Sequence, residues 1–273
     1  MDFWHYLFMQ KALIAGGILS FLAGVLSFFI INKDLSFIGV GLSHVAFGGI
    51  ALGLFFNLNP FFSATIFTLI LAFFIAQNSA SKQISENTSI GIFFSFSMAF
   101  GIILIGFKQG YSGDIFSFLF GSILSLNQTD IFILAGLSFI LLLALFFFAK
   151  PLLFLLFDPD YGRIHKMPIT LLYYSSILFL TLVIVNSIKM VGSILLSGLL
   201  ILPGATAYIV AQNYKQHLFF SIVFAFISII SGLISSYYLN LPPGGSIIVI
   251  ATIIFFIIKM IYGIEGRFHA KTK

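Results

Sequence analysis

Apolar stretches of about 20 residues recur along the whole chain, and they constrain its fold more than any other feature. Hydrophobic residues make up 60% of the 273 residues and charged residues only 8%. A soluble domain carries roughly 25% charged residues. Within a bilayer such stretches form helices, because a helix satisfies its own backbone hydrogen bonds. The sequence therefore predicts an all-α, polytopic membrane protein with one transmembrane domain over residues 1–273.

Nine stretches are candidates to cross the membrane, and we expect eight or nine transmembrane helices. The candidates are residues 12–31, 37–56, 62–76, 89–107, 131–149, 169–187, 190–202, 218–239 and 246–262. The stretch 190–202 is short, so its crossing is the least secure. Residues 115–120 are too few to cross, which predicts a short re-entrant or surface helix. Residues 1–10 predict an interfacial segment that leads into the first span.

Lysine and arginine are unevenly distributed between the two sides that nine crossings define. One side holds Lys11, Lys108 and Lys189, and the other side holds the remaining ten, including those of the basic tail, residues 263–273. Cytoplasmic loops are enriched in these residues. We therefore expect a cytoplasmic C-terminus and an outward N-terminus, in the cell (inner) membrane of a bacterium or archaeon. The net charge of +5 reflects these loops, and no nucleic-acid surface is predicted.

The residue inventory argues against catalysis. The chain has no cysteine, which excludes disulfides, thiolate metal sites and thiol nucleophiles. No hydrolase elbow, phosphate loop, metalloprotease signature or dinucleotide fingerprint is present. Asp158 and Asp160 flank Pro159, and that pattern predicts a turn. We expect no catalytic residue and no tightly bound cofactor.

His44 is the polar residue that most demands an explanation. It lies in an apolar, Gly-rich run that includes Gly41 and Gly48, inside the second predicted span. An ionisable side chain there is costly unless it faces protein, water or a ligand. Imidazole is a common ligand for transition metals, so His44 is a candidate metal ligand. The alternative is a histidine hydrogen-bonded to a neighbouring helix, and one histidine alone is no metal-site signature.

Two pairs of serines have the spacing that places their hydroxyls on one helix face. The pairs are Ser193 with Ser197, and Ser231 with Ser235. The ordinary interpretation is that each hydroxyl bonds to a carbonyl of its own helix.

Asp114 and Asp130 flank the predicted re-entrant segment. Their negative charges could attract cations. Helix capping is the alternative for both residues and the favoured interpretation for Asp130.

Residues 203–217 combine small and polar side chains and resemble neither a span nor an ordinary loop. A short helix with so little bulk could seat in a groove on a partner. The alternative is a plain connecting turn.

Several stretches, taken together, resemble the membrane permeases of metal-type ABC importers, which take up zinc, manganese or iron. Individually each stretch is weak, but they occur in the family's order and cover nearly the whole chain. They are residues 42–44 with 49–53, 88–92, 113–115 with 119–121, 157–160, 191–207 and 241–244.

The resemblance implies a permease that forms a homodimer in the membrane lipid and works with a cytoplasmic ATPase dimer and an external metal-binding protein. It implies that His44 is a transient metal ligand, with Asp114 a possible second ligand. We expect a path lined by Ser43, Ser193 and Ser197. The segment that couples to the ATPase would contain Gly204, Ala205, Thr206, Tyr208 and Gln212.

One departure from the family pattern affects the metal site. Family members usually carry an aspartate four residues before the histidine, where this chain has Val40, and often a proline four residues after it, where this chain has Gly48. A single imidazole attracts cations less than an imidazole beside a carboxylate. The site could recruit Asp114, a hydroxyl or the His44 of a second copy.

We therefore expect an importer permease for zinc or manganese, with zinc slightly preferred. Two alternatives remain. The same scaffold could import a metal chelate or a vitamin, with His44 only structural. The chain could also be a secondary transporter, although such carriers usually show carboxylates within their spans.

Overall fold

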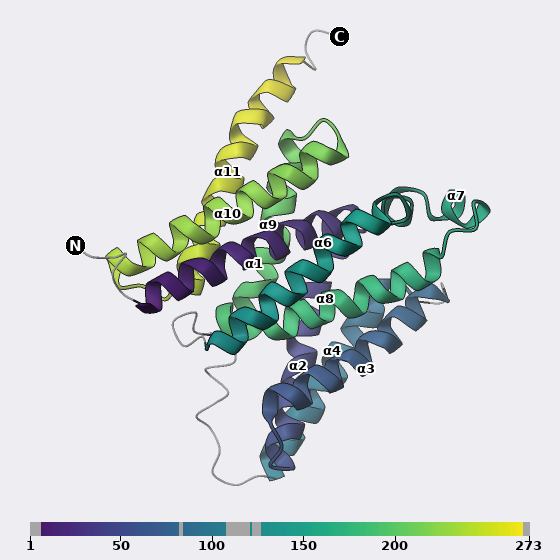
Figure 1. Cartoon of the computed structure of the whole chain (residues 1–273), viewed down its shortest axis with the longest axis vertical. Coiled ribbons are helices and arrows are strands. Elements are labelled where there is room, and N and C mark those ends of the chain that lie inside the picture. Colours follow the sequence, from purple (N-terminus) through teal and green to yellow (C-terminus); the bar gives the residue numbers. More distant parts are fainter. Residues whose placement is uncertain (1–6, 82–83, 108–120, 122–126, 270–273) are drawn as a thin grey trace.

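A computed structural model describes residues 7–81, 84–107, 121 and 127–269 (Figure 1). Regular structure in these ranges is helical throughout, with no strand. The helices are α1 (Leu7–Asn32), α2 (Ile38–Phe55), α3 (Pro60–Ala80), α4 (Glu86–Phe107), α6 (Gln128–Phe157), α7 (Pro159–Ile164), α8 (Ile169–Val191), α9 (Ser193–Val210), α10 (Tyr214–Leu239) and α11 (Pro243–His269).

The helix lengths confirm the predicted all-α membrane architecture. Eight helices of the described ranges are long and apolar enough to cross a membrane, and α9 contains a shorter apolar stretch, Leu196–Val210. The predicted re-entrant helix at residues 115–120 lies outside the described residues. Of the predicted interfacial segment, residues 1–10, the first six also lie outside them, and the last four belong to α1.

The predicted boundary at Pro203 is wrong. We expected a span that ends at residue 202, but α9 continues through Pro203 to Val210. Proline removes one backbone donor, and membrane helices tolerate this where neighbouring helices and side chains satisfy the freed groups. The true break precedes α9, at Gly192, whose φ of 89° is a conformation that favours glycine.

Helix α6 is longer than predicted and is kinked. It continues past the expected end at residue 149 to Phe157 and includes Pro151. Phe148, three residues before this proline, has non-helical dihedral angles. Proline accounts for the kink, because its ring displaces the preceding turn and the Phe147 carbonyl loses its usual donor.

Four interhelix connections, those from α1 to α2, α3 to α4, α6 to α8 and α9 to α10, meet at one end of the bundle (Figure 1). Three contacts hold this end together. The Asn32 side chain at the end of α1 contacts His217 at the start of α10. Lys33 Nζ donates to the Leu155 carbonyl near the end of α6. Tyr173 near the start of α8 donates to Glu86 at the start of α4.

The opposite end holds two of the tight turns. Asn57 and Asn240 adopt left-handed conformations after α2 and α10, with φ of 54° and 52°. The Asn59 side chain then accepts hydrogen bonds from the first turn of α3, whose first residue is Pro60. Helix α9 returns the chain from the end of α8 to the connection that leads into α10.

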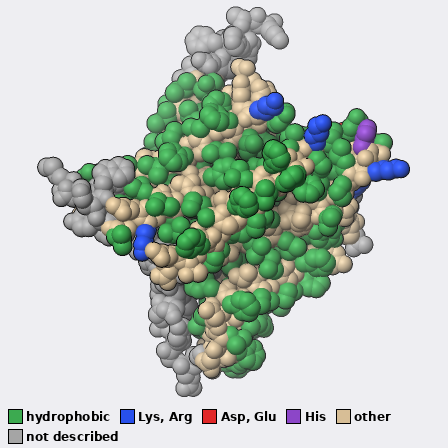
Figure 2. All heavy atoms as spheres, in the orientation of Figure 1, with side chains coloured by type: hydrophobic (Ala, Val, Ile, Leu, Met, Phe, Trp, Pro, Cys, Tyr) green, Lys and Arg blue, Asp and Glu red, His purple; other side chains and the backbone are tan. Residues whose placement is uncertain are grey.

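The outer surface is predominantly apolar, as a bilayer requires. Figure 2 shows a nearly continuous hydrophobic face with a few Lys and Arg side chains toward its margins. Large exposed side chains such as Phe132, Phe146 and Phe219 cover these outer faces. Small and aliphatic side chains, with buried serines, fill the interior.

Candidate functional site

Glycines of α2 allow two neighbouring helices to approach its backbone closely. A Cβ atom at Gly48 would overlap the side chain of Ser97 on α4, and one at Gly49 would lie 2.7 Å from the Cα of Ala64 on α3. Ser97 Oγ donates to the Val45 carbonyl of α2 at 2.8 Å. The glycine-rich run therefore holds α2 between α3 and α4.

His44 lies on the face of α2 that packs on α4. It falls between Gly41 and Gly48 in the helical repeat, and a Cβ at either glycine would collide with α4. Its ring makes an edge contact with Phe94 of α4, with 5.1 Å between ring centroids. The side chain is half-buried.

One nitrogen of the His44 imidazole has no hydrogen-bond partner among the described residues. This atom, Nδ1, is enclosed by protein. Buried polar atoms nearly always have a partner, so an enclosed nitrogen without one among the described residues is the feature of His44 that needs an explanation. The predicted alternative, a histidine hydrogen-bonded to a neighbouring helix, finds no such bond at Nδ1.

Two further unpaired polar atoms lie on α2 and α9. Ser43 and Ser193 are fully enclosed, and neither Oγ has a hydrogen-bond partner in the described part of the chain. A Cβ at Gly39 would lie 3.4 Å from the Cα of Ser197, which places these faces of α2 and α9 in contact. Ser43 and Ser193 each lie one helical turn away from that contact on the same faces.

Other polar residues have the structural roles that their spacing predicts. Ser231 and Ser235 donate to carbonyls of α10, those of Ile227 and Gly232. Asp130 caps α6 by accepting from the Asn127 backbone at 2.9 Å, as predicted. The hydroxyl of Ser193 differs from these, because it finds no such carbonyl.

The remaining site predictions meet different outcomes. Asp114 lies outside the described residues. Val40 is half-buried and supplies no carboxylate. No group of three His, Asp or Glu side chains that could hold a metal ion occurs among the described residues.

The five predicted coupling residues separate into a buried and an exposed set. Gly204 packs against Ser27 of α1 and donates to its Oγ at 2.7 Å. Thr206 is buried, and Ala205 is half-buried. Tyr208 and Gln212 are exposed.

A buried polar network at the end of α9 was not predicted from the sequence. His217 of α10 is 4% exposed, and its Nε2 lies 3.0 Å from the Gly204 carbonyl. Its Nδ1 lies 3.1 Å from Asn32 Nδ2, which also donates to the Phe28 carbonyl. The network joins α1, α9 and α10. The one signal that the sequence offers for it is a histidine directly before the predicted span 218–239.

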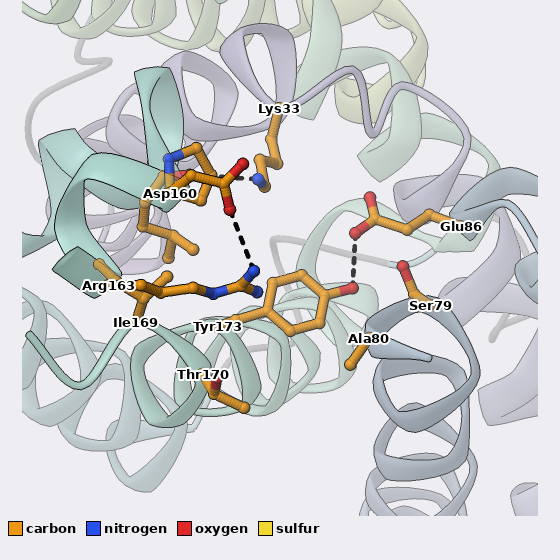
Figure 3. Close-up of a pocket in the computed structure, with 11 residues that line it drawn as sticks. Lys33, Ser79, Ala80, Glu86, Asp160, Arg163, Ile169, Thr170 and Tyr173 are labelled. Carbon is orange, nitrogen blue, oxygen red and sulfur yellow. Dashed lines mark hydrogen bonds and ion pairs between the residues drawn. The ribbon is translucent and has the colours of Figure 1, made fainter. Parts of the chain in front are cut away.

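A polar pocket of about 250 Å³ lies at the end where the four connections meet (Figure 3). The Tyr173 hydroxyl donates to Glu86 Oε1 at 2.6 Å. Arg163 pairs with Asp160 of α7 at 3.1 Å. Asp158 caps α7 by accepting from the Tyr161 backbone, so the predicted turn is a short helix.

Comparison with known proteins agrees with this architecture. Residues 5–262 match the model of the ABC 3 transport family. The manganese transport system membrane protein MntC of Listeria monocytogenes is 34% identical over 98% of this chain and 96% of its own length. The high-affinity zinc uptake system membrane protein ZnuB of Haemophilus influenzae is 29% identical over 89% of this chain and 94% of its own.

A solved structure of similar sequence shares the fold. PsaBC from Streptococcus pneumoniae in complex with Fab contains a chain that is 36% identical, with a TM-score of 0.81 over 94% of this chain and 93% of that one. The chain therefore belongs to the ABC 3 transport family. It is a multi-pass membrane permease subunit of an ABC transporter.

Proposed function

We propose that this permease imports a divalent transition metal, Mn²⁺ or Zn²⁺, with ATP hydrolysis on a separate partner chain as the driving force. The observation that carries the proposal is His44, whose enclosed Nδ1 is unpaired among the described residues. Relatives that match nearly the whole chain are named for manganese or zinc transport. Their names support a metal as cargo rather than a vitamin or chelate.

The donor set favours manganese over zinc, against the slight preference for zinc drawn from the sequence. His44 offers one imidazole, and the predicted path residues Ser43, Ser193 and Ser197 offer hydroxyl oxygen. Manganese accepts oxygen ligands readily, whereas selective zinc sites draw on several imidazoles or thiolates. A conducting site must also release its ion, so weak, incomplete coordination suits transport.

Two groups could complete the coordination of a metal at His44. One is Asp114, which the sequence places before the predicted re-entrant helix. The other is the His44 of a second copy, if two permeases form a homodimer around the path. High affinity would then belong to an external metal-binding protein.

The ATPase dimer would dock where the four connections meet. Lys33, Arg163 and Lys166 lie at this end, and the positive-inside rule supports its assignment to the cytoplasmic side. Tyr208 and Gln212 are the predicted coupling residues with exposed side chains there, and the short helix α7 lies at the same end. Gly204, Ala205 and Thr206 would transmit the motion through their packing in the bundle.

Metal uptake in proteoliposomes that contain the permease, its ATPase and its external binding protein tests the cargo. We expect ATP-dependent Mn²⁺ uptake by the wild type and a loss of at least tenfold in His44→Ala, the scale of one lost ligand-orienting contact. Phe94→Leu is the matched control, because it removes the ring that contacts His44 and keeps the imidazole. Normal uptake by His44→Ala would reject the ligand role, and uptake without ATP would favour a secondary transporter.

Charge substitutions test the docking end. Tyr208→Glu, Gln212→Glu and Arg163→Glu should lower co-purification of the ATPase and uncouple its hydrolysis from uptake. Tyr238→Glu is the control, because Tyr238 is 66% exposed at the opposite end of α10. If Tyr208→Glu and Gln212→Glu retain coupling while Arg163→Glu loses it, the docking element is α7 alone.

A further inference from the structure

An apolar groove lies in a part of the bundle to which α2, the helix that carries His44, contributes no lining residue. Its volume is about 580 Å³, within the range of roughly 300–1,000 Å³ typical of small-molecule sites. Helices α1, α6, α8 and the start of α10 form its walls, and nearly all of its lining side chains are apolar. None of the residues assigned to the metal path contributes to it.

The kink in α6 explains why the groove exists. Phe148, where the helical dihedral angles fail, lines the groove, and so does Leu152 just beyond Pro151. A straight helix could keep its side chains in register with α1 and α8, whereas a proline kink displaces the following turns. Small side chains such as Ala144 and Ser176 leave further room along the walls.

The groove lies in the half of the membrane that faces the end with four connections. Counted from Ile131, where the apolar part of α6 begins, 20 residues bring the helix to Lys150. Twenty helical residues span about 30 Å, the thickness of the hydrocarbon layer. The groove begins near Ile140, at mid-membrane, and reaches Tyr214 and Pro168 at the polar boundary.

Two lysines directly follow, in the chain, residues that line the polar part of the groove. Lys150 follows the lining residue Ala149, and Lys215 follows the lining residue Tyr214. Both lysines are exposed, and neither has an ion-pair partner among the described residues. An apolar groove with lysines at its margin is complementary to an anionic lipid. The acyl chain of such a lipid would lie in the groove, and its phosphate would lie near the lysines.

We propose that this groove binds one anionic glycerophospholipid from the leaflet on the side of the four connections. An acyl chain lies along Ile140, Ala144 and Phe148, and the phosphate pairs with Lys150 and Lys215. The lipid fills the space that the α6 kink opens and joins α6 to α1 and α8. The proposal does not depend on the identity of the transported cargo.

Native mass spectrometry of the purified transporter tests the site. The protein is washed exhaustively in detergent and then equilibrated with equal amounts of dioleoyl phosphatidylglycerol and dioleoyl phosphatidylcholine. We expect one lipid retained per permease chain, with phosphatidylglycerol favoured at least about fivefold, the effect of a single lysine near a membrane surface. Retention of neither lipid, or of both equally, would overturn the proposal.

Two variants separate the headgroup and acyl-chain contributions. Lys150→Gln with Lys215→Gln should bring the two lipids to equal retention, whereas Lys259→Gln on α11 should leave the preference intact. Ala144→Trp should reduce retention of both lipids, and Phe146→Trp, on an outward face of α6, should not. Because Lys150 and Lys215 are exposed, their double variant folds normally. An unchanged preference in that variant rejects the site even if Ala144→Trp does not fold.

Discussion

His217 Nε2 donates a hydrogen bond to the Gly204 carbonyl across 3.0 Å, and this bond joins α10 to α9 one residue after Pro203. The neighbouring amide fixes the direction of the bond. Asn32 Nδ2 must donate to the Phe28 carbonyl at 2.7 Å, so it also presents a donor to His217 Nδ1. Nδ1 therefore accepts, and the single proton of a neutral imidazole lies on Nε2.

Removal of the His217 ring should destabilise the bundle. His217→Phe keeps the bulk but leaves Asn32 and Gly204 without their partner, and an unsatisfied buried polar group costs about 1–3 kcal/mol. The free energy of unfolding in detergent, measured by denaturant titration, checks this loss. His165→Phe, at the exposed position directly after α7, is the control, and equal stability of His217→Phe and wild type would contradict the bond.

A methyl group at Gly48 should separate α2 from α4. Gly48→Ala places a Cβ against Ser97, whose backbone carbonyl oxygen lies 2.7 Å from that position. Overpacking of this kind costs about 1–3 kcal/mol. Gly91→Ala on α4 is the matched control, because no atom lies within 4 Å of its Cβ position.

The expected result for the control has the opposite sign. Alanine in a helix interior is favoured over glycine by about 1 kcal/mol, so Gly91→Ala should be neutral or slightly stabilising. Thermal unfolding of both variants in the same detergent measures the difference. A Gly48→Ala protein as stable as Gly91→Ala would show that α2 and α4 do not pack as described.

A carboxylate at position 40 should strengthen metal binding at His44. Residues 40 and 44 lie one helical turn apart, so Val40→Asp would place a carboxylate beside the imidazole. We expect half-maximal Mn²⁺ uptake at a concentration lower by about tenfold, the effect of one added interaction of roughly 1.4 kcal/mol. Val40→Asn has the same shape without the charge and should match the wild type. If both variants behave alike, the gain is not electrostatic.

The bond between Tyr173 and Glu86 should stabilise the junction of α8 with α4. Hydrogen bonds to a charged group contribute about 1.5–3 kcal/mol. A double-mutant cycle with Tyr173→Phe and Glu86→Gln should therefore give a coupling energy above about 1 kcal/mol in unfolding experiments. Tyr174→Phe in place of Tyr173→Phe should show no coupling to Glu86. Additive effects of Tyr173→Phe and Glu86→Gln would mean that the bond does not form in the membrane protein.

Most of the fold could be predicted because the bilayer limits the choices. The hydrocarbon thickness sets the length of each apolar stretch. The start of α3 is also readable, because Asn59 is a capping residue and proline is favoured at the first position of a helix. The predicted helix ends before Pro203 and Pro151 were wrong, because proline ends helices in water more reliably than in a bundle within the membrane.

The site could be predicted only in part. His44 is conspicuous in sequence, because an ionisable group in an apolar run is costly. Its contact with Phe94 depends on the packing of α2 against α4, which no local pattern encodes. The His217 network was missed because Asn32 lies 185 residues away along the chain. That partner becomes adjacent only when α1 meets α10.

The connection between α8 and α9 consists of Gly192 alone. One residue spans at most about 3.5 Å, so this connection has no slack to absorb a displacement of either helix. A swing of the far end of α9 relative to α8 would therefore require rotation about the dihedral angles of Gly192. Such a rotation would occur directly beside the enclosed hydroxyl of Ser193.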